Sequence, residues 1–142
     1  MVATVSALGL DIGRRRVGVA GCDGTGLIAT GLTTLYRRSF GELIADLQHI
    51  AQVRQAQILV VGLPLTMDGE EGFQSRQVRK VAAGLSQALA LPLVYVDERL
   101  SSVEAEQFMR AEGQFPDQDK GLIDRKAAAI ILQRWLDDRR PS

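Results

Sequence analysis

The stretch "LGLDIGRRRVGVA", Leu8 to Ala20, places an aspartate inside an apolar run, continues with three arginines and then returns to an apolar run. Two extended apolar runs joined by a short turn are typical of a β-hairpin. Asp11 stands at the end of the first run, where an ionised carboxylate is costly to bury unless a partner stabilises it. The stretch therefore predicts two neighbouring strands and raises the question of what Asp11 does there.

The segments that follow predict an α/β sheet. A third extended run, Leu27 to Leu35, continues an antiparallel meander. The capping box "SFGE", Ser39 to Glu42, precedes an amphipathic helix. Continuous apolar runs at Ile58 to Pro64 and Leu93 to Asp97 predict two buried strands, with a second amphipathic helix between them. Strands that alternate with helices in this way predict parallel strands in the centre of the sheet.

Two further helices are expected near the C-terminus. Ser101 and Glu104 form a second capping box just after "DER", and the segment Gly113 to Gly121 separates that helix from the last one. Within the last helix, apolar residues four, seven and eleven positions after Asp124 share its face: Ala128, Ile131 and Trp135. That face is expected to pack on the sheet, so Asp124 is expected to point toward it.

Composition bounds the class of protein. The 142 residues fit one domain, 1–142, and 46% hydrophobic with 24% charged residues is typical of a soluble globular chain. No apolar run approaches the roughly 20 residues of a membrane span and no secretory signal is evident, so a cytoplasmic protein is expected. The single cysteine, Cys22, excludes an internal disulfide and a Cys-cluster metal site. Seventeen basic residues balance seventeen acidic ones, so nucleic-acid binding would need local clusters.

Carboxylates gather where an open α/β sheet places its functional groups. Asp11 and Asp97 end apolar runs, and the carboxyl ends of parallel strands converge on one crevice. Together with Asp124 they would repel one another unless a cation neutralised them, and oxygen ligands favour Mg²⁺ or Mn²⁺. A pair of such ions about 3.5 to 4 Å apart activates water and stabilises the leaving oxygen in phosphodiester cleavage. A metal-dependent nuclease is the leading hypothesis.

Each feature also has a simpler interpretation. Asp124 alone could complement the helix dipole, and Asp97 with Glu98 could pair with Arg99. The D-x-G-x-x-x-x-G spacing resembles a phosphate loop of actin-like ATPases, although 142 residues leave no room for their second domain. The one histidine, His49, lies off the apolar spacing of its helix, which disfavours a catalytic triad.

Four blocks, taken in order, resemble a known family: "GLDIGRRRVGVA", "ILVVGLPLTMDGEEGFQSRQVRKVA", "VYVDERLSSVEAE" and "KGLIDRKAAAIILQRWL". From about Leu8 to Asp137 the chain resembles the YqgF family of RNase-H-like proteins, described as pre-16S rRNA nucleases and as Holliday-junction-resolvase-like. The resemblance implies an RNase-H-like fold, in which a five-stranded mixed sheet, an antiparallel meander followed by parallel strands, is flanked by helices.

The resemblance also implies a site. Asp11, the acidic pair Asp97 and Glu98, and Asp124 would form the metal-binding catalytic set. Neighbouring strand residues face opposite sides, and of the pair we favour Asp97 as the metal ligand. The arginines expected to contact substrate are Arg14, Arg15, Arg16, Arg76 and Arg99. The chain departs from the family pattern at Arg14, often a small hydroxyl residue or aspartate, and at Phe73, often proline.

The function implied is a Mg²⁺- or Mn²⁺-dependent nuclease that processes the 5′ end of precursor 16S rRNA in ribosome biogenesis. Nucleic acid and ribosomal particles are the expected partners, and the protein is expected to be a monomer or homodimer. The alternatives are a Holliday junction resolvase acting on DNA, a non-catalytic nucleic-acid-binding module, and an actin-like ATP-binding protein.

Overall fold

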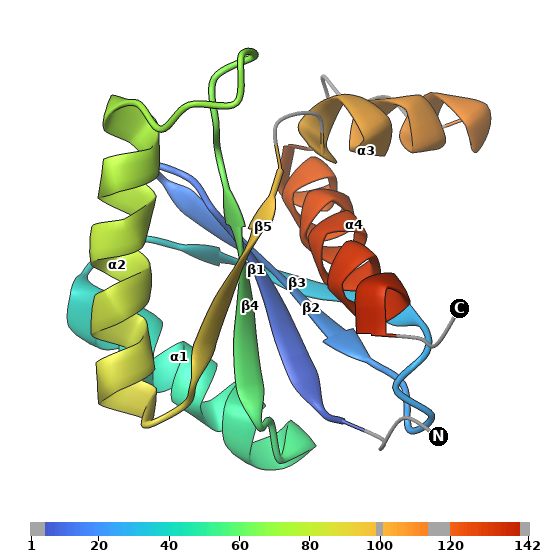
Figure 1. The fold of residues 1–142 in the computed structure, drawn as a ribbon. Coiled ribbons are helices and arrows are strands. Elements are labelled where there is room, and N and C mark those ends of the chain that lie inside the picture. The colour runs from blue at the N-terminus through green and yellow to red at the C-terminus, as the bar shows by residue number, and fades with distance from the viewer. Residues whose placement is uncertain (1–4, 99–100, 114–119, 140–142) are drawn as a thin grey trace.

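A five-stranded mixed sheet forms the centre of the molecule and carries helices on both faces (Figure 1). The computed structural model describes residues 5–98, 101–113 and 120–139, with only the backbone at 101–103. The strands are β1 (Ala7–Ile12), β2 (Arg16–Cys22), β3 (Ala29–Tyr36), β4 (Ile58–Leu63) and β5 (Leu93–Asp97). The helices are α1 (Phe40–Arg54), α2 (Phe73–Leu89), α3 (Ser101–Ala111) and α4 (Lys120–Arg139). None of the described helices is long and apolar enough to cross a membrane.

The sheet confirms the predicted topology. Its strand order is β3-β2-β1-β4-β5, with β1–β2 and β2–β3 antiparallel and β1–β4 and β4–β5 parallel. The third strand begins at Ala29, two residues later than predicted. The Asp23 carboxylate accepts hydrogen bonds from the backbone N–H groups of Leu27 and Ile28, at 3.1 and 3.3 Å, and this holds both residues in the preceding turn.

Alternation along β1 assigns its side chains to two different layers. Leu8 and Leu10 point into the core formed with α1 and α2, whereas Ala7 belongs to the cluster under α4. Side chains two residues apart share a face, so Gly9 and Asp11 lie on the α4 side. Asp11 therefore stands at the carboxyl end of the central strand, away from the larger core.

Local capping fixes where the first helix begins. The Ser39 hydroxyl accepts a hydrogen bond from the backbone N–H of Glu42 at 3.1 Å, as the capping box predicted. The second predicted box depends on Ser101, whose side chain lies outside the described residues.

Helix α4 packs unusually close to the sheet because glycines face it. A Cβ at Gly9 would lie 2.7 Å from the Cβ of Leu132, and one at Gly18 would overlap the backbone carbonyl of Asp124. Any side chain at these positions would push the helix outward. The predicted face is confirmed, since Ala128 and Ile131 are buried against the sheet.

Candidate active site

Strand pairing and helix packing bring two of the predicted carboxylates, Asp11 and Asp124, together. Asp11 of β1 pairs with Gly18 of β2 in the antiparallel register, and the Asp124 turn of α4 lies directly on Gly18. Because Asp11 and Gly18 are opposite each other, the helix turn that rests on one lies beside the other. Asp11 and Asp124 therefore meet at the end of the sheet beneath the first turns of α4.

Glu98, rather than Asp97, is the third carboxylate of this group. In β5, Val94 and Val96 pack on the α4 side, whereas Tyr95 packs with the α1–α2 core. Alternation then gives Asp97 the face of Tyr95 and Glu98 the face of Val96. The Cβ of Glu98 lies 2.9 Å from where a Cβ on Gly62 would be, and Gly62 is on the α4 side of β4. The structure therefore places Glu98, on the α4 side, with Asp11 and Asp124, while the identity of the metal ligand among Asp97 and Glu98 stays a prediction.

The negative charges of Glu98 and Asp124 act on Asp11. The pKa of Asp11 is raised to about 7, first because burial disfavours its ionised form and then because Glu98 and Asp124 are negative. The positive charge of Arg16 acts in the opposite direction and lowers the pKa of Asp11. The group is thus short of positive charge at neutral pH.

Asp124 already has one cationic partner. The Arg16 Nε donates a hydrogen bond to Asp124 Oδ2 at 2.5 Å, and both side chains are largely shielded from solvent. Arg16 begins β2 and lies two residues before Gly18, so alternation places it on the α4 side. Arg16 was predicted to contact substrate, but in this structure its guanidinium pairs with Asp124.

The donor set is chemically suited to a hard divalent cation. Asp11, Glu98 and Asp124 supply carboxylate oxygens alone, the ligands that Mg²⁺ and Mn²⁺ prefer. Within the described ranges no group of three His, Cys, Asp or Glu side chains is already spaced to hold a metal ion. One carboxylate oxygen of Asp124 is instead engaged by Arg16 in the ion pair described above.

Comparison with protein families places the chain. A family model described as "RuvX: Holliday junction resolvase" matches residues 5–138. The chain belongs to the RuvX family. A relative from Trichormus variabilis, named "Putative pre-16S rRNA nuclease", is 61% identical over 140 residues, covering 99% of this chain and 93% of the relative. A Microcystis aeruginosa relative of the same name is 63% identical over 136 residues, covering 96% and 94%. These matches confirm the resemblance to YqgF proteins.

Solved structures support the fold of this RuvX-family chain. RuvC of Thermus thermophilus superposes with a TM-score of 0.57 and 14% identity, covering 94% of this chain and 95% of that one. A fowlpox virus resolvase with Holliday junction DNA gives a TM-score of 0.55 and 8% identity, covering 94% and 97%. At such low identity the likeness concerns architecture alone, and it confirms the predicted RNase-H-like sheet.

Three of the other predicted arginines of the RuvX-family chain are exposed to solvent. Arg14 and Arg15 are exposed in the turn between β1 and β2, and Arg76 is exposed in the first turns of α2. Arg99 lies outside the described residues. Arg37, which the adjacent pair of arginines in the sequence also marks as a candidate phosphate contact, donates from its Nη1 to the carbonyl of Gly13 at 2.7 Å.

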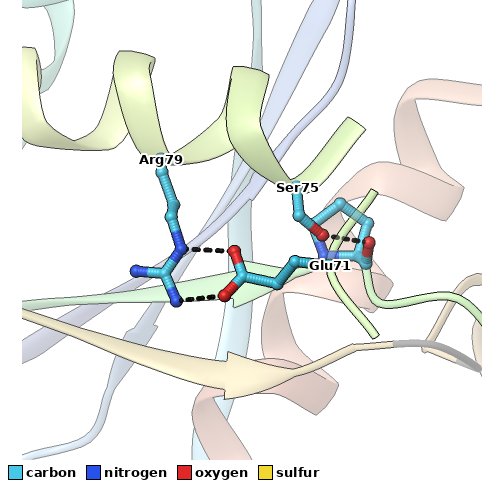
Figure 2. Close-up of polar contacts among 4 residues, drawn as sticks. Glu71, Ser75 and Arg79 are labelled. Carbon is cyan, nitrogen blue, oxygen red and sulfur yellow. Dashed lines mark hydrogen bonds and ion pairs between the residues drawn. The ribbon is translucent and has the colours of Figure 1, made fainter. Parts of the chain in front are cut away.

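The loop after β4 is tied firmly to α2 (Figure 2). The buried Ser75 hydroxyl donates to the carbonyl of Pro64 at 2.6 Å. Arg79 donates to both carboxylate oxygens of Glu71, at 2.5 and 2.9 Å. Its guanidinium also lies 4.5 Å from the centre of the Tyr95 ring. These contacts fix both ends of the loop at the same sheet edge as Asp11.

Proposed function

We propose that this protein is a divalent-metal-dependent nuclease that hydrolyses phosphodiester bonds in precursor 16S rRNA. The observation that carries the proposal is the convergence of Asp11, Glu98 and Asp124 at the end of the sheet; burial first, and then the negative charges of Glu98 and Asp124, raise the pKa of Asp11 to about 7. The names of the relatives at 61–63% identity support the reaction and the substrate. Processing of a ribosomal precursor would take place in the cytoplasm, and the expectation of a monomer or homodimer stays a prediction.

In this proposal the three carboxylates hold Mg²⁺ or Mn²⁺. The bound cation would supply positive charge that polarises the phosphate and makes water a better nucleophile. Asp11, with a pKa of about 7, would have to lose its proton to hold a cation, so cation binding should be tighter at higher pH. Arg16 orients Asp124 through their ion pair, and it would be available to a substrate phosphate if a cation took its place on Asp124.

The adjacent residues Asp97 and Glu98, together with Asp11, provide the test. Wild type, Asp11→Asn, Glu98→Gln and Asp97→Asn would be incubated with precursor 16S rRNA and with a four-way DNA junction, with and without Mg²⁺. The first two substitutions remove proposed ligands and should lower cleavage about 100-fold or more. Asp97→Asn, on the opposite face of the sheet, should cleave within a few-fold of wild type. Wild-type rates for Asp11→Asn would refute the proposed site.

A DNA junction resolvase is the second candidate, because the matching family model carries that description. Cleavage of the junction but not of the RNA would establish it. Binding of either substrate without metal-dependent cleavage would instead indicate a non-catalytic module that has kept the fold.

A further inference from the structure

A groove lies beside the proposed active site, at the same end of the sheet as Asp11 but on the face that α2 covers. It has a volume of about 570 Å³, within the range of ligand sites. Ile12 and Gly13, which line it, follow Asp11 directly in the chain. On its other side it is lined by the first turns of α2, including Phe73 and Val78. An extended ligand that passes over this end of the sheet can therefore occupy the carboxylate site and the groove together.

Phe73 supplies an aromatic surface at the groove. It is the first residue of α2, and 71% of its surface is exposed, whereas Val78 beside it is buried. An exposed aromatic ring next to buried apolar side chains offers one free face for stacking. Nucleic-acid bases stack on such rings whatever their sequence, because every base has a π-face.

The charges that line the groove are positive. Its ionisable lining residues are Arg14 and Arg37, and the hydrogen bond from Arg37 to the Gly13 carbonyl fixes that guanidinium in place. Glu71, two residues before Phe73, is neutralised by the two hydrogen bonds from Arg79 (Figure 2). Helix α2 starts after Gly72, which has no side chain to cap the first N–H groups, so the positive end of the helix dipole adds to the field.

We propose that this groove binds an unpaired nucleotide next to the bond that is cut. Its base stacks on Phe73 while neighbouring phosphates contact Arg14 and Arg37. Bases within a duplex are stacked on each other and their faces are inaccessible, so the occupant is single-stranded. The inference rests on the proposed nuclease function and narrows its substrate to strands with unpaired residues beside the scissile bond.

Binding without metal separates this inference from catalysis. Fluorescence anisotropy in EDTA would measure the affinity of the protein for labelled single-stranded RNA and DNA of about 12 nucleotides. Blunt hairpins of the same sequence would serve as the duplex comparison. Phe73→Ala should weaken single-strand binding about 5- to 150-fold, the cost of one lost stacking contact, and leave hairpin binding within two-fold. Phe73→Trp should retain binding and Phe73→Leu should not, since leucine preserves apolar contact but not stacking. Whichever of RNA and DNA shows this dependence identifies the strand.

The matched control is Phe108→Ala, which removes another exposed phenylalanine, on α3. It should bind like wild type. Arg14→Gln should reduce the slope of log affinity against log salt by about 0.7, the value for one phosphate contact on a single strand. A photo-crosslink from 5-bromouridine in the bound strand should map to the peptide that contains Phe73.

Equal losses for Phe73→Ala and Phe108→Ala, or an unchanged single-strand affinity in Phe73→Ala, would overturn the inference. Its failure differs from a failure of the proposed function. If the protein binds single strands through Phe73 but cleaves no substrate with Mg²⁺, the groove inference stands and the nuclease proposal fails. If Phe73→Ala cleaves at the wild-type rate, the nuclease proposal stands and the groove inference fails.

Discussion

Asp11→Asn should stabilise the metal-free protein at alkaline pH. The carboxylate has a pKa of about 7 in the folded chain against 3.8 unperturbed, so the folded state keeps a proton that the unfolded state has released. Stability linked to Asp11 is fully present below pH 4 and is lost as the pH rises toward 7. Asparagine has the same shape and no charge, so it escapes this loss.

The magnitude follows from the size of the shift. A rise of about three pKa units, at 1.36 kcal/mol each, sets a ceiling of about 4 kcal/mol at pH 8. Asp11 retains some contact with solvent, which screens part of its charge, so a gain of about 1–3 kcal/mol is expected. For a chain of this size that gain raises Tm by roughly 3 to 10 °C.

Urea and thermal unfolding in EDTA at pH 8 and pH 5 would measure the gain. At pH 5 the folded wild type is already protonated, so the advantage of Asp11→Asn should shrink by more than half. Asp46→Asn, on the exposed side of α1, is the control and should change stability by less than about 0.5 kcal/mol at both pH values. Added Mg²⁺ should raise the Tm of wild type more than that of Asp11→Asn. A variant no more stable than wild type at pH 8, or a gain independent of pH, would refute this reasoning.

Three further substitutions test how the site is held. Gly18→Ala should lower the free energy of unfolding by about 1–3 kcal/mol, because its Cβ would displace the α4 backbone, and it should also weaken Mg²⁺ binding measured by calorimetry. The control Gly24→Ala, whose Cβ would meet open space, should change neither quantity. Arg16→Gln should lower Tm in EDTA at pH 8, because Asp124 loses its cation, yet bind Mg²⁺ more tightly by calorimetry; weaker Mg²⁺ binding would show that the arginine does not compete. Ser75→Ala should lower the free energy of unfolding in urea by about 1–2 kcal/mol, because the partly buried Pro64 carbonyl loses its donor, and an unchanged midpoint would show that water replaces the hydroxyl.

The positions of the strands along the chain and the face of the last helix that carries Asp124 could be predicted from the sequence because both depend on periodicity. Apolar spacing located the strands, and the residues that follow Asp124 at helical intervals identified its face. The choice between Asp97 and Glu98 could not be made in this way. Strand β5 carries apolar residues toward both faces, so its sequence has no polar alternation to show which side meets α4.

Two other differences arise from contacts that sequence patterns do not encode. The apolar pair Leu27 and Ile28 has high strand propensity, but hydrogen bonds from their backbone to Asp23 hold them in a turn. Arg16 is indistinguishable from its two neighbours in "RRR" until strand pairing places it under α4, 108 positions before its partner Asp124. Each outcome depends on a side chain that satisfies a particular donor or acceptor.

The glycines of the sheet connect the fold to the proposed chemistry. Glycine within a strand is unfavourable, yet Gly9, Gly18 and Gly62 all occur on strand positions that face α4 or Glu98. Side chains there would hold α4 away from the sheet, and Asp124 would then stand too far from Asp11 to raise its pKa. The cost to the strands is thus coupled to assembly of the carboxylate group. The strand cost is present in every state, whereas burial and crowding of the carboxylates are costly when no cation neutralises them, so the stability of this protein should depend strongly on pH and on divalent cations.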